Sequence, residues 1–140
     1  MRDGLDISQL EEFNQEIIRL AGQQLPRERD NFLKKEATEL RKNTARRAKM
    51  VVNKKTGNYF KGIKKGKVYT YGAERAIRVY GGAPHSHLIE DGHRMIVNGR
   101  EVGFVRGYHI YEQVGREFEE QFYKDCEQFV DDILEEGLRL

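Results

Sequence analysis

The chain has few of the residues on which several classes of site depend. Cys126 is the single cysteine among 140 residues, so an intramolecular disulfide and a CxxC redox or zinc pair are excluded. Tryptophan is absent, and proline occurs only twice. No apolar run approaches the roughly 18 residues that span a bilayer. Residues 1–7 also lack the basic-then-apolar pattern of a signal peptide, so we expect a soluble protein without membrane contact, made in a cytoplasm.

Common catalytic motifs are missing as well. The chain has neither the phosphate-binding GxxxxGK[ST] loop nor the GxSxG nucleophile elbow around Ser86. The adjacent Glu90 and Asp91 project in diverging directions, whereas glycosidase carboxylates face each other across the substrate. We therefore expect no enzyme and no cofactor, and interpret these two carboxylates as local caps or ion-pair partners.

Charge is plentiful and strongly segregated, although the net charge is only +2. Residues 27–67 carry fifteen basic and four acidic side chains, whereas residues 112–140 carry three basic and ten acidic ones. This layout favours either a nucleic-acid contact or head-to-tail packing of identical subunits. The alternative is that the two segments are neighbouring solvated helices that balance each other within one subunit.

Helical patterns occupy the first third of the chain. Ser8 and Glu11 form a capping box that predicts a helix start. Pro26 should interrupt this helix and let a second, basic helix begin at a different angle. The apolar positions of the second helix recur every three or four residues, at Leu33, Ala37, Leu40, Thr44, Ala48 and Val51. Between residues 53 and 66 the period fails, which predicts a loop with a short turn.

Two hairpins and a long helix complete the predicted fold. Residues 67–71 and 76–80 read as the strands of one hairpin, and residues 95–97 and 101–105 as those of another. The second hairpin turns at Asn98-Gly99, a pair that favours a type I′ turn. From about His109 a helical stripe follows, formed by Tyr111, Val114, Phe118, Phe122, Cys126 or Asp125, Phe129 and Ile133. Gly115 within it suggests a close backbone contact.

The predicted fold class is α+β, with one domain over residues 1–140. A small antiparallel sheet made of the two hairpins should pack with two N-terminal helices and the long C-terminal helix, whose three phenylalanines should anchor the core.

The segment from Gly81 to Arg94 concentrates three of the four histidines and resembles a site. His85, His87 and His93, with help from Glu90 or Asp91, are residue types that bind zinc. However, Pro84 and Ser86 predict a helix start and Gly92 its end. Histidines two apart on a helix diverge by about 200°, so a metal site requires this segment to be extended.

Nucleic-acid binding is the second alternative. The basic helix is followed by a lysine-rich stretch in which Tyr59 and Phe60 are interleaved, and such a surface could follow a phosphate backbone and stack on bases. The lysines of this stretch are Lys54, Lys55, Lys61, Lys64, Lys65 and Lys67. No helix-turn-helix, zinc-finger or RNA-recognition motif accompanies them.

Two motifs resemble a known family. The first is Thr56-Gly57-Asn58 after the basic helix, and the second is Ala83-Pro84-His85-Ser86-His87-Leu88-Ile89-Glu90, followed by Gly92. In this combination, with hairpins and an acidic final helix, the chain is similar to the tail-completion, or head-tail joining, proteins of long-tailed phages and prophages. The resemblance covers about the last ninety residues.

The resemblance implies a structural role rather than catalysis. A member of this family would be assembled in the host cytoplasm and sit in the virion neck, as a ring of identical subunits between tail-tube or tail-terminator and head-connector proteins. Its motif residues would form turns and packing contacts. Combined with the charge pattern, it makes the following residues our candidate interface: Arg41, Lys42, Arg46, Arg47, Lys49, Lys54, Lys55, Lys61, Lys64, Lys65, Asn98, Gly99 and Arg100. Contact of the lysines with DNA would be incidental.

Overall fold

A computed structural model describes residue 15, residues 18–52 and residues 57–137. The predicted capping box at Ser8 and three motif or interface residues, Lys54, Lys55 and Thr56, lie outside the described residues. The elements in chain order are η1 (Leu20–Gln24), α2 (Leu25–Val51), α3 (Asn58–Lys61), β1 (Ile63–Lys65), β2 (Tyr69–Tyr71), β3 (Glu74–Ala76), β4 (Val79–Gly81), α4 (Ser86–Asp91), β5 (Gly92–Val97), β6 (Arg100–Arg106) and α5 (Ile110–Gly137). The α+β class is confirmed.

The predicted break at Pro26 is wrong. The chain is helical on both sides of it, because the π-helical segment η1 leads directly into α2 and Gln24 at the junction has helical angles, φ −76° and ψ −48°. Pro26 lies in the first turn of α2, where its missing N–H removes no hydrogen bond of that helix. Helical backbone therefore runs from Leu20 to Val51.

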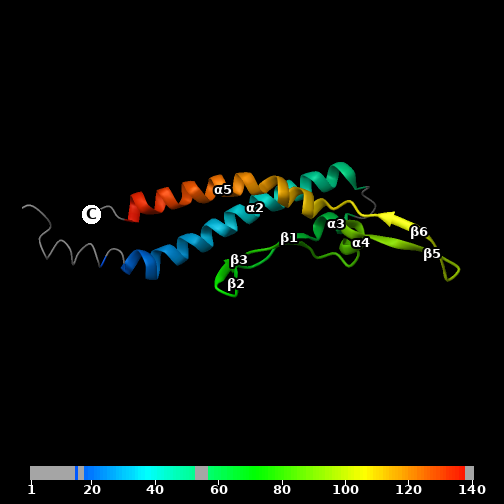
Figure 1. Ribbon diagram of the computed structural model, residues 1–140, viewed down its shortest axis with the longest axis horizontal. Coiled ribbons are helices and arrows are strands. Elements are labelled where there is room, and N and C mark those ends of the chain that lie inside the picture. Colours follow the sequence, from blue (N-terminus) through cyan, green and yellow to red (C-terminus); the bar gives the residue numbers. More distant parts are fainter. Residues whose placement is uncertain (1–14, 16–17, 53–56, 138–140) are drawn as a thin grey trace, which may run out of the picture.

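The long helices α2 and α5 lie side by side and run in opposite directions, which gives the molecule an elongated shape (Figure 1). The phenylalanines of α5 are partly buried against α2, but they do not anchor the core as expected, since the buried cluster contains none of them. The Phe32 ring of α2 stacks on Phe129 at 4.6 Å between ring centroids and lies 6.1 Å from Phe122. Gly115 does not mark a close approach, since a Cβ atom there would meet nothing within 4 Å.

The sequence predicts a single small sheet, and this prediction is wrong. The strands form three separate two-stranded antiparallel ladders. β1 pairs with β4 and β2 with β3, so both ladders belong to one long hairpin whose tip turns between Tyr71 and Glu74. The sequence does not predict the first ladder, because Ile63-Lys64-Lys65 lies in the stretch where a loop is expected. Its strand conformation comes from pairing with residues 79–81 and from Arg41 of α2, whose Nε donates to the Ile63 carbonyl at 2.9 Å.

The second hairpin, β5–β6, has the predicted turn. Asn98 and Gly99 have φ angles of +53° and +77°, the two positive values of a type I′ turn. A register shift between Met95 and Ile96 interrupts the ladder. Figure 1 shows this hairpin projecting beyond the ends of the helices, away from the rest of the molecule. We call residues 92–106 the arm.

The best-buried part of the core lies where the basic helix, β1 and the start of α5 meet. It consists of Ala48, Tyr59, Ile63, Ile110 and Val114. Here the first turns of α5 pack against α2, α3 and β1. The arm joins the body at the same place. Across the part of the chain that the structure describes, no helix combines the length and apolarity needed to cross a bilayer.

One carboxyl group is buried between the long helices. Glu36 of α2 is 9% exposed and lies beside Asp125 of α5. Burial, reinforced by the Asp125 carboxyl, raises the pKa of Glu36 to about 7 from an ordinary value of 4.5. Between pH 4.5 and about 7, Glu36 is therefore protonated in the folded protein and ionised in the unfolded chain.

This buried carboxyl predicts a pH-dependent stability. The stability that the raised pKa of Glu36 contributes is fully present below pH 4.5 and is lost as the pH rises through about 7. Relative to the wild type, Glu36→Gln should gain roughly 1–3 kcal/mol in unfolding free energy between pH 4.5 and 8, measured by urea denaturation. Glu135→Gln, at an exposed carboxylate of α5 whose charge does not act on Glu36, is the matched control and should follow the wild type. Parallel pH profiles for Glu36→Gln and wild type would contradict the assignment.

Candidate functional site

The Gly81–Arg94 segment folds as a turn and a short helix, as its proline and glycine predict. After β4, His85 occupies the N-cap position and α4 runs from Ser86 to Asp91. Gly92 ends it with φ +85°, and a Cβ atom there would collide with the Val105 carbonyl oxygen. Glycine is thus required at Gly92 both by its backbone angle and by the close approach of β6.

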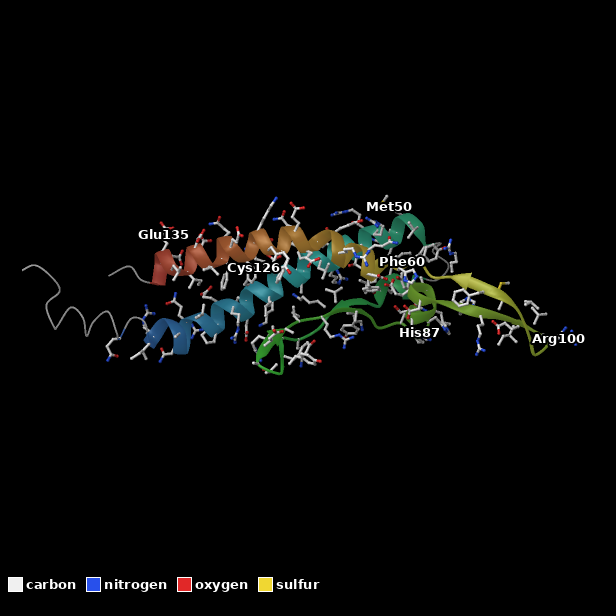
Figure 2. The ribbon with its side chains drawn as sticks, viewed as in Figure 1. Met50, Phe60, His87, Arg100, Cys126 and Glu135 are labelled. Carbon is white, nitrogen blue, oxygen red and sulfur yellow. The ribbon has the colours of Figure 1, made fainter. Side chains whose placement is uncertain are left out.

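The three histidines do not converge. His85 and His93 both line a hollow of about 240 Å³ at the base of the arm, together with Tyr108 and apolar side chains, but His87 is not part of its lining. His87 is exposed on α4 (Figure 2). In the described ranges, no three side chains among histidine, cysteine, aspartate and glutamate are grouped so that they could hold a metal ion. His85 precedes α4, His87 lies in its first turn and His93 lies on β5, so the extended segment that would align His85 with His87 is not formed.

Glu90 has a role that its neighbours in sequence do not reveal. Its carboxylate accepts hydrogen bonds from the backbone N–H groups of Tyr111 at 3.1 Å and Glu112 at 3.2 Å. These are among the first amides of α5, which have no partner within that helix. Glu90 therefore serves as the N-cap of a helix twenty residues further along the chain, and its negative charge lies at the positive end of the helix dipole. We expected a local cap.

Backbone hydrogen bonds strengthen the same junction. The N–H of Tyr108 donates to the Ile89 carbonyl at 2.9 Å, and that of His109 to the Glu90 carbonyl at 3.0 Å. His109 has φ +51°, a left-handed conformation that turns the chain from the arm into α5. The end of α4, the base of the arm and the start of α5 thus form one connected unit.

Hydroxyl groups fill the interior behind α4. Ser86 is buried, and its Oγ lies with the Tyr111 hydroxyl against the backbone of Gly81, where no Cβ could fit. Burial raises the pKa of Tyr111 to about 12 and also raises that of Tyr59. These groups stay neutral at physiological pH. They are packing residues rather than activated nucleophiles.

Several predicted interface cations are engaged within the subunit. Arg47 of α2 donates to both carboxylate oxygens of Glu117 on α5, at 2.7 and 2.9 Å. Arg41 is bound to the Ile63 carbonyl. Lys65 returns to α2, where its Nζ donates to the Thr38 hydroxyl at 2.9 Å. The basic and acidic helices therefore neighbour each other in one subunit, which is the third of the arrangements that the charge pattern allowed.

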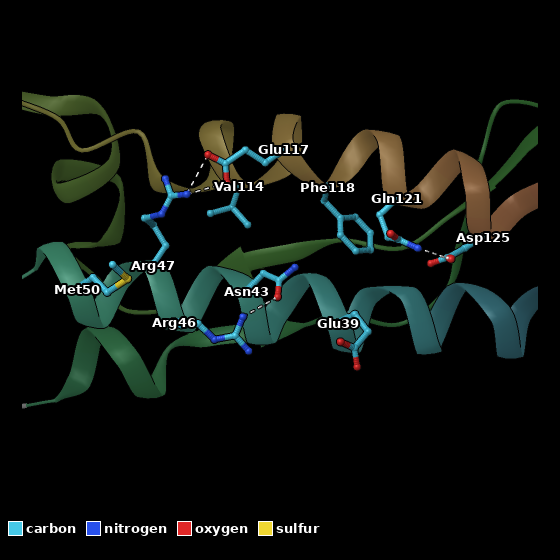
Figure 3. A pocket seen from close by; sticks show the side chains of 10 residues that line it. All are labelled: Glu39, Asn43, Arg46, Arg47, Met50, Val114, Glu117, Phe118, Gln121 and Asp125. Carbon is cyan, nitrogen blue, oxygen red and sulfur yellow. Dashed lines mark hydrogen bonds and ion pairs between the residues drawn. The ribbon is translucent and has the colours of Figure 1, made fainter.

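The other candidates lie at the surface in two separate places. Arg46, Lys49, Lys61 and Lys64 are exposed on α2, α3 and β1, and Lys42 is exposed beside Glu39. Arg46 and Arg47 border an open groove of about 680 Å³ between α2 and α5 (Figure 3). By contrast, Asn98, Gly99 and Arg100 form the tip of the arm, which projects away from the helices (Figure 1). The structure does not bring the two groups together.

Base stacking on Tyr59 is ruled out by its position. Tyr59 is a core residue, 9% exposed, and its ring meets Phe60 edge to face at 5.6 Å. Phe60 is partly buried against the same core, so of the two aromatic rings expected beside the lysines one is buried and the other is only partly accessible.

The arm carries the surface that sequence reasoning missed. Its two strands expose six large apolar side chains, Met95, Ile96, Val97, Val102, Phe104 and Val105. From the sequence we expect their strands to belong to a small sheet that packs with the helices. The signal that could have revealed them is the run Met95-Ile96-Val97: because strand residues alternate between faces, three consecutive apolar residues place apolar groups on both faces.

Comparisons of the chain with protein-family models, with curated proteins and with solved structures found no match.

The Glu90 cap makes a direct prediction about stability. Glu90→Ala should lower the unfolding free energy by about 1–2 kcal/mol, because two amides of α5 lose their acceptor. Glu90→Gln, which retains an acceptor oxygen but not the charge, should cost less. Asp91→Ala, at the adjacent exposed carboxylate, should change stability by less than about 0.5 kcal/mol in the same urea titration. Equal losses at both positions would contradict a specific cap.

The ion pair between the long helices predicts a smaller effect. Arg47→Ala should destabilise the protein by about 0.5–1 kcal/mol, and a double-mutant cycle with Glu117→Ala should show coupling that weakens in 1 M salt. Arg46→Ala is the control, since the guanidinium of Arg46 donates to Asn43 on its own helix and not to α5. No coupling at low salt would show that the pair contributes nothing to stability.

Proposed function

We propose that this protein is a non-enzymatic component of a phage or prophage neck, which joins tail to head through contacts within a ring of identical subunits and with neighbouring virion proteins. The observation that carries the proposal is the use of the motif residues. Gly92 and Glu90 shape and cap the junction between α4 and α5, and Ser86 packs beneath it. They serve architecture, as the resemblance to head-tail joining proteins implies.

The surface of the molecule supports an assembly role. The arm leaves its apolar side chains uncovered, and contiguous exposed apolar surface on a protein marks interaction sites. Exposed cations on α2 and a predominantly acidic α5 provide oppositely charged surfaces on the same subunit. Identical subunits can therefore meet through unlike charges, which is the basis of heterologous ring contacts.

The test is genetic complementation in the phage or prophage that encodes the chain. Disrupting the coding region should leave full heads and tails unjoined in electron micrographs and abolish plaques, and the wild-type gene should restore both. Normal virions from the disrupted phage would refute the function.

Charge reversal then tests the basic surface. Arg46→Glu with Lys49→Glu should lower the yield of infectious particles at least about tenfold, because both exposed cations are reversed while the Arg47–Glu117 pair is kept. The matched control applies the same charge change to two exposed cations of the first hairpin, as Lys67→Glu with Arg78→Glu, and should keep full infectivity. Full infectivity of the Arg46 and Lys49 variant would remove this face from the interface, without bearing on the arm.

A further inference from the structure

The arm is a two-stranded ladder with both faces open to solvent. Every residue from His93 to Arg106 is exposed, including Ile96 at 59% and Phe104 at 58%. An isolated hairpin of this kind is marginally stable in water and requires a hydrophobic partner for one of its faces. Among the described residues, the arm is joined to its own subunit at its base, where β5 contacts α4. Its exposed strands are therefore open to a partner from outside the subunit.

The charges of the arm exclude a second arm as that partner. Arg94, Arg100 and Arg106 stand against a single carboxylate, Glu101, which lies 3.9 Å from Arg94. Two arms placed together would bring these arginines into proximity and leave few carboxylates to balance them. The surface that the arm fits is apolar in the middle and acidic around it.

The outer face of α5 has this composition. Tyr123, Val130 and Leu134 are 59%, 51% and 49% exposed, and their spacing of seven and four residues places them on one stripe of the helix. Acidic residues interleave with and flank this stripe, at Glu119, Glu120, Glu127 and Asp131. The stripe is thus the charge complement of the arm.

An apolar groove adjoins the stripe. It has a volume of about 430 Å³, lies between α2, α5 and the β3–β4 side of the first hairpin, and includes Tyr123 and Glu119 in its wall. Its apolar lining comes mainly from Leu33, Ala37, Leu40, Ile77, Phe118 and Phe122. Side chains of the size of Ile96 or Phe104 have a place to enter beside the acidic stripe.

The arm cannot reach this surface on its own subunit. Figure 1 shows it at the end of the molecule opposite the C-terminal part of α5, pointing outward. An arm that binds α5 therefore binds a different copy, and the two surfaces involved are different. Such a heterologous contact repeats from copy to copy and closes a ring when the rotation permits.

We propose that the arm of one copy docks on the α5 stripe and adjoining groove of a second copy, with arginines of the arm against carboxylates of the stripe. The proposal deepens the proposed function and rests on it for the ring, but its contact can be tested on the purified chain alone.

The first test is self-association measured by sedimentation equilibrium of the full chain, up to about 1 mM at low salt. Arg94→Glu with Arg100→Glu, and separately Glu119→Lys with Glu127→Lys, should each raise the dissociation constant about tenfold or more. The chain carrying all four substitutions should associate within about threefold of the wild type, because arm and stripe are again complementary. Arm-to-arm or stripe-to-stripe contacts would not be restored by this combination. Lys67→Glu with Arg78→Glu, at two exposed cations outside the candidate interface, is the control and should leave association unchanged.

The second test locates the contact. In a Cys126→Ser background, a chain with Ile96→Cys mixed with a chain with Tyr123→Cys should give a heterodimer with a short bismaleimide. A mixture of the Ile96→Cys chain and a Met50→Cys chain, whose cysteine lies on exposed α2, should not. A monomer at every concentration, no rescue by the fourfold variant, or equal cross-linking to Met50→Cys would each overturn the docking proposal. A phage that loses head-tail joining on disruption would still support the proposed function in that case.

Discussion

The structure depends on the Glu90 carboxylate at the first turn of α5. Two amides that have no partner in their own helix are bound by a side chain from α4, and two adjacent backbone hydrogen bonds hold the same elements together. This junction sets where α5 starts and where the arm leaves the body. The packing of α5 on α2 and the outward direction of the arm both follow from it, because each begins at the same few residues.

Opposite charges have two roles in this molecule. Between α2 and α5 they meet within one subunit, at Arg47 and Glu117, so the segregated charge pattern is in part neutralised internally. The outer face of α5 and the arm retain charges of opposite sign with apolar side chains between them. Electrostatic contacts of this kind contribute more to the choice and orientation of a partner than to stability.

Local signals in the sequence were reliable where the backbone itself imposes a choice. Asn98-Gly99 predicted its turn because both residues tolerate positive φ, and Pro84 and Gly92 correctly bounded α4. The break at Pro26 failed because a proline in a first helical turn is tolerated after a π-helical segment. The single sheet failed because strand pairing between residues 63–65 and 79–81 is non-local, and lysines beside glycines carry no strong strand signal.

The sequence by itself determined the features that follow from backbone freedom and apolar period. These are the apolar period of α5, the turns of the two hairpins and the charge of each helix. Only the tertiary structure decided what those elements meet. It turned Glu90 from a local acid into the cap of a distant helix, buried Tyr59, paired Arg47 with Glu117 and left the apolar residues of the arm uncovered. The physical reason is that burial and pairing are properties of contacts between distant segments, and neither propensity nor spacing along the chain specifies which segments come together.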